Sequence, residues 1–146
     1  MALTFEQEVY RYCVADDNDD VRLCPMKSEV NIYRGSFVGT SRGWARPLEA
    51  GDPFLGIATL HINNLEGADG DQDVAVRTRG DFLLTMCSAG IEVGRTVYAS
   101  DDCTLKLTPT GNSLIGTCVG IADAEHVVVR LIPDYSLPDV RGWKTP

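Results

Sequence analysis

The chain has 146 residues, 44% of them hydrophobic and 23% charged, which is typical of one soluble globular domain with appended segments. The formal net charge of −8 repels nucleic-acid phosphates and favours a basic partner surface, so we expect no direct nucleic-acid binding. No apolar run approaches the roughly 20 residues that span a bilayer, and the first residues lack the features of a secretory signal. We therefore expect no membrane contact, and a protein that works in the cytoplasm or leaves it by cell lysis.

The first stretch, residues 1–30, differs in composition and pattern from the rest of the chain. Its segment FEQEVYRYCV alternates apolar and polar side chains with a period of two, which predicts a strand. The acidic run DDNDD at 16–20 follows, and four aspartates in five residues favour a solvated turn. Two interpretations stay open: an extended arm that pairs with a neighbour, or the first hairpin of the domain itself.

Residues 31–133 form the expected body of the protein. Short runs of Val, Ile, Leu, Thr and Tyr recur here between Gly, Asn, Asp and Pro, which predicts many short strands and no long helix. Their spacing of about ten residues is typical of a small barrel or sandwich, so we predict an all-β fold. The strand-like runs are VNIYRGSFVGT, DPFLGIATLHI, DVAVRTRGDFLLTM, TVYAS, CTLKLTP, LIGTCVGIA and HVVVRLI.

The last stretch, residues 134–146, is expected to be an extended C-terminal tail, because its prolines and Arg141-Gly142 suit a segment without a packed core. Trp143 in this tail either docks on its own domain or is presented to a neighbour.

A short internal repeat runs through the body. The segment GDPFLGIA at 51–58 resembles GNSLIGTCVGIA at 111–122. Each copy is followed by a similar strand, VAVR at 74–77 and VVVR at 127–130. Two copies of one β unit would cover each other's apolar faces, as a small and nearly closed barrel requires.

The sequence carries no pattern that requires catalysis or a cofactor. The two histidines, His61 and His126, have no metal-ligand spacing and read as ordinary strand or turn residues. The acidic loop DGDQD at 69–73 lacks the spacing of a calcium-binding EF-hand and reads as a solvated connection. The five cysteines are scattered without a CxxC pair, so most of them are expected to behave as small buried hydrophobes.

A basic, aromatic stretch stands out at Arg42, Trp44 and Arg46. Trp and Arg are enriched among interface hot spots, so these residues, together with Trp143, are a possible protein interface. The alternative is a hairpin with a cross-strand cation–π contact.

The serial order of five segments resembles the capsid cement or head-decoration proteins of tailed phages. The resemblance covers roughly residues 32–132. Each segment alone is a pattern of glycines and strand-forming residues that is not specific to this family, so the resemblance depends on their order. The segments are IYRGSFVGTSRGWARPLEAGDPFLGIA at 32–58, EGADGDQ, DVAVRTRGDFLL at 73–84, AGIEVGRTVYASDDCTL at 89–105 and GNSLIGTCVGIADAEHVVVRL at 111–131.

The resemblance implies a β-rich structural protein of the virion, not an enzyme, that decorates and stabilises the outside of the capsid by binding the major capsid protein. It further implies a frequent trimeric state and no cofactor. The lead-in and the tail lie outside the resemblance. From the alternating arm we predict that residues 1–15, with Phe5, Val9, Tyr10 and Tyr12, contact the shell.

Two rival functions remain open from the sequence. One is a trimeric tail or fibre module that binds host glycans through exposed aromatic side chains. The other is a small β-barrel enzyme that works at a trimer interface and brings together His61, His126 and aspartates from separate subunits. It would need a convergent cluster of these groups in a deep polar pocket.

Overall fold

A computed structural model describes residues 2–7, 21–85 and 90–132. Within these ranges the regular structure is entirely strand, so the predicted all-β fold is confirmed. The described part contains no helix long and apolar enough to cross a membrane. The strands are β1 (Val21–Pro25), β2 (Val30–Ile32), β3 (Phe37–Ser41), β4 (Trp44–Pro47), β5 (Phe54–Ala58), β6 (Ile62–Asn64), β7 (Asp73–Arg77), β8 (Asp81–Thr85), β9 (Thr96–Ala99), β10 (Leu105–Lys106), β11 (Ser113–Ile121) and β12 (His126–Leu131).

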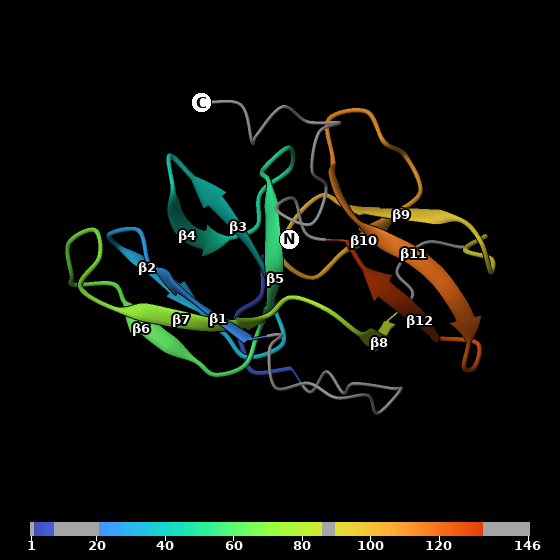
Figure 1. The fold of residues 1–146 in the computed structure, drawn as a ribbon, viewed down its shortest axis with the longest axis horizontal. Coiled ribbons are helices and arrows are strands. Elements are labelled where there is room, and N and C mark those ends of the chain that lie inside the picture. The colour runs from blue at the N-terminus through green and yellow to red at the C-terminus, as the bar shows by residue number, and fades with distance from the viewer. Residues whose placement is uncertain (1, 8–20, 86–89, 133–146) are drawn as a thin grey trace.

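Two five-stranded antiparallel sheets divide the body into two halves, which lie side by side in Figure 1. The first sheet has the order β1-β7-β5-β3-β4, and the second has the order β10-β9-β11-β12-β8. Both orders describe the same connectivity: within each sheet the first strand in sequence pairs with the last, the last with the fourth, the fourth with the second, and the second with the third. The body is therefore a duplicated β unit, of which the short repeat in the sequence is one visible part.

The pairing registers of the two sheets agree around a bulge that both sheets contain. In the first sheet Val38 pairs with Gly56 and the next pair skips one residue, Leu55, to form a bulge. In the second sheet Val97 pairs with Gly116 and the bulge follows at the same place. The arginines of the two similar strands also match, because Ile57 pairs with Arg77 and Thr117 pairs with Arg130.

The two halves pack front to back, so that equivalent faces do not meet. The inner face of the second sheet includes Val97, Leu105, Cys118, Val127 and Val129, and these side chains join one buried cluster with Phe37, Phe54 and Ile57 of the first sheet. The second-sheet equivalents of those three first-sheet residues are Thr96, Leu114 and Thr117, which are exposed or half-buried. A face that another layer covers is thus apolar and aromatic, and its uncovered copy is more polar.

The small two-stranded sheet β2–β6 supplies the cover that the first sheet needs. Ile32 of β2 joins a second buried cluster with Val38, Ala45, Ala58, Val74 and Val76 on the inner face of the first sheet. The bulge at Leu55 serves both clusters, since it shifts the strand period so that Phe54 and Ile57, three residues apart, face the same side.

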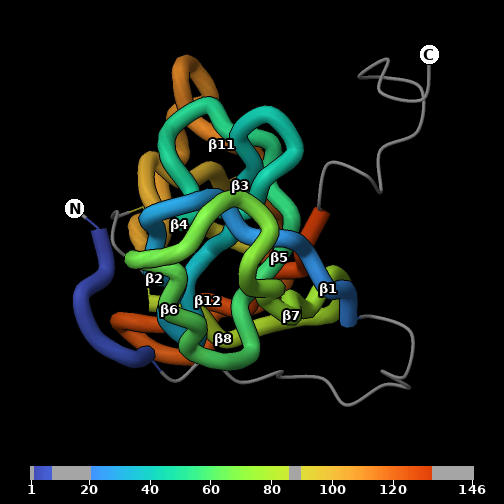
Figure 2. Tube along the Cα trace, turned by 90° about the vertical axis from the view of Figure 1, so that its left-hand side faces the viewer, coloured from blue at the N-terminus to red at the C-terminus, as the bar shows by residue number. Residues whose placement is uncertain are grey.

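Residues 21–26, which precede the expected start of the body at residue 31, are part of the first sheet. Strand β1 pairs with β7 along five residues. Met26, which follows β1, is fully buried and bridges to Ala45 of β4. The two edge strands of this sheet, β1 and β4, therefore approach each other, and the half is nearly closed. Figure 2 shows β1 beside β7.

The repeated glycine of the two sheets generates a testable prediction. A Cβ at Gly116 would overlap the carbonyl oxygen of Arg130, as one at Gly56 would overlap that of Arg77. Gly116→Ala is therefore expected to lower the free energy of unfolding by about 2 kcal/mol or more in a urea titration. Gly120→Ala on the same strand is the control, because its Cβ would meet only Val128 at 3.6 Å. Equal stability of the two variants would contradict the prediction.

Candidate interaction site

Residues 2–7, here called the N-terminal strap, lie on the surface of the body (Figure 2). At one end the Leu3 N–H donates to the Asp102 carboxylate at 2.9 Å. At the other end the Gln7 N–H donates to the Arg34 carbonyl at 3.1 Å, and the Gln7 side-chain amide donates to the Gly35 carbonyl at 3.3 Å. Because Asp102 belongs to the β9–β10 connection and Arg34 to the β2–β3 connection, the strap bridges the two halves.

A polar cluster holds Glu6, next to the Gln7 end of the strap. One carboxylate oxygen of Glu6 accepts the Arg34 N–H at 2.9 Å, and the other lies 3.1 Å from Nδ1 of His61. The ring of His61 stacks on Tyr33, with centroids 4.6 Å apart and 14° between the planes. Its Nε2 lies 2.6 Å from Oδ1 of Asn31. The histidine therefore fixes the strap to the β2–β3 region.

Phe5 is the exposed apolar residue of the strap. Its side chain keeps 67% of its surface accessible, although its neighbours Glu6 and Gln7 are hydrogen-bonded to the body. An exposed aromatic group on a docked backbone loses little conformational freedom when a partner covers it. Of the other residues predicted to contact the shell, Val9, Tyr10 and Tyr12 lie outside the described residues.

The Arg–Trp stretch lies on the β3–β4 hairpin. Arg42 is exposed at its turn with φ of 54°, beside Gly43 at 89°. Trp44 is half-buried and lies against Gly70, where a Cβ would come within 3.2 Å of the indole ring. Arg42, Trp44 and Arg46 are all described residues, and neither arginine makes a cation–π contact with Trp44. Trp143 lies outside the described residues.

Arg46 has an internal role in the structure. Its guanidinium donates to both carboxylate oxygens of Asp52, at 2.9 and 2.8 Å, and a further ion pair joins it to Glu49 at 3.3 Å. The hydrogen bonds to Asp52 raise the pKa of Arg46. Gly39 makes room for this pair, since a Cβ there would lie 2.8 Å from Cβ of Asp52. Arg46 thus fixes the β4–β5 connection, whereas Arg42 and Trp44 keep accessible surface.

The two histidines have separate partners. His61 contacts Glu6 and Asn31, whereas His126 pairs with Asp123 in the turn before β12, at 2.9 Å. The described residues thus do not bring the two histidines into one cluster. No substrate-binding arrangement follows from either of them alone.

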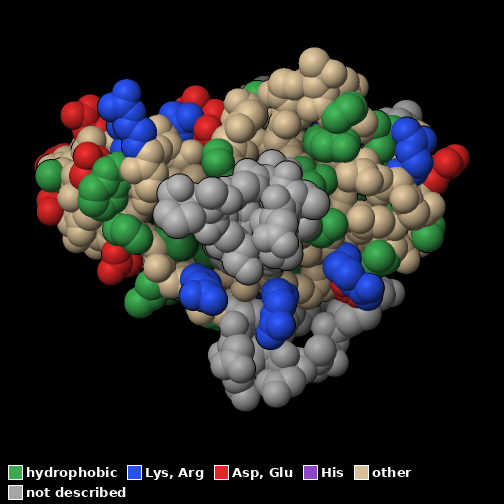
Figure 3. Space-filling view, turned by 45° about the horizontal axis from the view of Figure 1, so that its top comes forward, with side chains coloured by type: hydrophobic (Ala, Val, Ile, Leu, Met, Phe, Trp, Pro, Cys, Tyr) green, Lys and Arg blue, Asp and Glu red, His purple; other side chains and the backbone are tan. Residues whose placement is uncertain are grey.

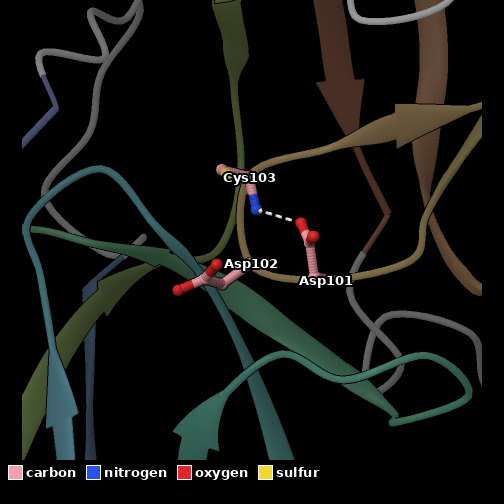
Figure 4. Close-up of side chains that lie close together, drawn as sticks. All are labelled: Asp101, Asp102 and Cys103. Atoms are coloured by element: carbon pink, nitrogen blue, oxygen red, sulfur yellow. Dashed lines mark hydrogen bonds between the residues drawn. The ribbon is translucent and has the colours of Figure 1, made fainter. Parts of the chain in front are cut away.

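One group of potential metal ligands occurs in the described residues: Asp101, Asp102 and Cys103, whose ligand atoms lie within 4.8 Å of one another. The Asp101 carboxylate caps its own turn by accepting the N–H of Cys103 at 3.0 Å (Figure 4) and the N–H of Thr104 at 2.9 Å. Burial opposes ionisation of Asp101, yet its pKa is lowered, and hydrogen bonds from Cys103 and Thr104 are among the causes. Burial and the two carboxylates raise the pKa of Cys103 to about 11, so its thiol stays protonated at neutral pH. Asp101 therefore stabilises its own turn, and Asp102 of the same turn anchors the strap through Leu3.

The acidic loop at 69–73 is likewise used by backbone groups. Asp69 accepts the Ser28 N–H at 2.8 Å, and Asp71 accepts the Ala68 N–H at 2.9 Å.

Charges of both signs are interspersed on the face drawn in Figure 3. An open cavity of about 650 Å³ beside the strap is also mixed in charge, since Lys27, Glu49 and Asp101 are among its lining residues.

These features define a small duplicated β module in which Arg46, Asp101, Asp69 and Asp71 serve its own turns and ion pairs. Comparison with family models finds a match to the phage cement proteins over residues 17–132. The chain therefore belongs to the phage cement protein family, and the predicted resemblance is confirmed. Membership implies a structural, generally non-enzymatic role on the phage capsid. A search of curated proteins finds no match.

The anchor at Asp102 generates a prediction with a defined pH dependence. Burial raises the pKa of Asp102, so the folded state binds its proton more tightly than the unfolded chain does. Its contribution to stability consequently falls as the pH rises from about 3.9, the value of an unfolded aspartate, through the raised folded value. Asp102→Asn keeps an acceptor for the Leu3 N–H and removes this fall. The variant is expected to be at least as stable as the parent at pH 7.

Urea titrations at pH 4 and pH 7 check this expectation. Asp102→Ala is the matched comparison, because it removes the acceptor and leaves the Leu3 N–H unpaired, so it is expected to be about 1 kcal/mol less stable than Asp102→Asn at both pH values. An Asn variant that is clearly less stable than the parent at pH 7 would show that the ionised carboxylate is favourable.

Proposed function

We propose that this cement protein binds the outer surface of the assembled capsid by contacting the major capsid protein lattice, and that the N-terminal strap supplies part of the contact. Family membership supports the capsid as the location. The observation that carries the proposal for the contact is Phe5, which is 67% exposed on a segment held to the body at both ends. Val9, Tyr10 and Tyr12 extend the same segment in the sequence and are included in the proposed contact.

Such a contact stabilises the shell by mass action. A subunit that binds the assembled lattice, and binds separated capsid subunits less well, shifts the equilibrium toward the intact shell. Burial of one exposed phenylalanine contributes about 1.5–3 kcal/mol, and a lattice multiplies the effect over its many sites. The net charge of −8 suits a basic lattice surface. Arg42 and Trp44, which keep accessible surface on the β3–β4 hairpin, are proposed as a second contact, with Trp143 of the tail.

The contact at Phe5 is tested by substitution. Phe5→Ser is expected to reduce binding to empty capsids at least about tenfold in co-sedimentation, because it removes the exposed ring without touching either buried cluster. Leu23→Ser on β1 is the matched control, since Leu23 is similarly exposed at 71% and lies on the edge of the first sheet. Undiminished coating by the Phe5 variant would refute the proposed contact.

We also propose that the protein is a trimer when it decorates the shell, as the family resemblance suggests. Light scattering of the purified protein is expected to give three times the chain mass of 15.9 kDa at the concentrations that coat capsids. If it gives a single chain mass, density on decorated capsids shows whether three copies meet at one site. Isolated single copies there would contradict the proposal.

A further inference from the structure

Asn64, the last residue of β6, has a buried side-chain oxygen without a partner. The residue is 2% exposed, and its Nδ2 donates to the carbonyl oxygens of Lys27 at 2.8 Å and Ala68 at 3.2 Å. Backbone carbonyl oxygens can only accept hydrogen bonds, so these two contacts fix which side of the amide carries Oδ1. No described group donates to this oxygen. A buried polar atom of this kind calls for a donor or a positive ion.

The oxygen of Asn64 faces Gly67 in the β6–β7 loop, residues 65–72. A Cβ at Gly67 would overlap Oδ1 of Asn64, and it would lie 3.2 Å from Oδ2 of Asp71. An amide oxygen and a carboxylate oxygen therefore converge on the same side of this glycine. Oδ2 of Asp71 also accepts the Ala68 N–H at 2.9 Å, but a carboxylate has about four lone-pair sites and can bind a further group.

A cavity of about 440 Å³ adjoins the two oxygens. Asn64 and Asp71 line it together with Asn63, Glu66 and Gln72, so that each polar side chain of the lining carries an oxygen. None of the described residues that line it is a lysine or an arginine. A set of amide and carboxylate oxygens without a basic neighbour favours a hard cation. Calcium accepts such irregular sets and completes them with water, whereas magnesium demands a nearly octahedral geometry.

The exposure of the loop allows an ion to reach the buried oxygen. Every residue from Leu65 to Asp73 is exposed apart from Gly67, which is half-buried over Asn64. Solvent-exposed segments with few buried contacts open at a low cost in free energy. A shift of Gly67 away from Asn64 is therefore the movement that binding requires.

We propose that the β6–β7 loop is a calcium site, in which Oδ1 of Asn64 and the carboxylates of Asp71 and Glu66 are the protein ligands. It differs from the Asp101–Cys103 group because its buried donor is an amide oxygen. The ion gives this oxygen a partner and ties the loop to β6, so binding stabilises the folded protein. Two carboxylates on an exposed loop resemble weak extracellular calcium modules, with a Kd of about 0.1–1 mM.

Calcium binding is measured on the full-length protein after a chelator has removed metal ions. Calorimetric titration with CaCl₂ is expected to show one saturable site, and the midpoint of thermal unfolding is expected to rise up to about 10 mM calcium. MgCl₂ at the same concentrations controls for ionic strength and is expected to bind at least about tenfold more weakly. Binding that does not saturate, or equal binding of the two ions, would overturn the inference.

Substitutions separate a defined site from a general attraction to acidic charge. Asp71→Asn removes a charge but keeps an acceptor for the Ala68 N–H, and it is expected to raise the Kd for calcium about tenfold or more. Asp73→Asn is the matched control, because this exposed carboxylate at the start of β7 does not line the cavity. Its Kd is expected to stay within about twofold of the parent. Equal losses in the two variants would show diffuse attraction and contradict the proposed site.

Terbium gives an independent readout of where the ion binds. Trp44 lies against Gly70 of the same loop, where a Cβ would come within 3.2 Å of its ring. An excited indole sensitises Tb³⁺ luminescence only at short range, so TbCl₃ is expected to give a signal that excess CaCl₂ removes. Trp44→Phe should abolish this signal, and Trp143→Phe, at the other tryptophan of the chain, should leave it unchanged. Loss of the signal in the Trp143 variant alone would place the ion elsewhere and refute the site.

Discussion

The packing of the first sheet's outer face into the inner face of the second sheet is the interaction on which the rest of the structure depends. Phe37 and Phe54 meet edge to face, with centroids 6.1 Å apart, and insert among the apolar side chains of β9, β11 and β12. Aromatic pairs in this geometry add to the gain from burial alone. Without this contact the inner face of the second half would be open to solvent, because that half has no equivalent of β2–β6 within the described residues.

Front-to-back packing also explains why two copies of one β unit have diverged. Each face has a different neighbour: β2–β6 covers the first inner face, the first half covers the second inner face, and the outer face of the second sheet carries threonines. A head-to-tail arrangement is heterologous, so equivalent positions are under different demands. Backbone requirements are shared, and for that reason the bulges and the close-packed glycines Gly56 and Gly116 are repeated where the side chains are not.

The same packing places the strap. Its anchors at Asp102 and Arg34 come from different halves, so their spacing is set by how the halves meet. Next to the Arg34 anchor, a histidine from the β5–β6 connection reaches Glu6 of the strap beside Tyr33 of the β2–β3 connection. The proposed capsid contact is thus carried by a segment outside both buried clusters, and its position depends on charge and hydrogen bonding more than on apolar packing.

The sequence by itself determined the fold class, most of the strands and the family, because period-two patterns and glycine or proline turns are local properties of the chain. It also revealed the repeat, and the pairing of the strands gives its register, in which Gly56 corresponds to Gly116. Only the tertiary structure decided that Arg46 belongs to Asp52, that His61 belongs to Glu6, and that the halves stack front to back. These outcomes depend on contacts between residues far apart in the sequence or on the identity of a covering layer, and no local pattern encodes which of two apolar faces will be covered.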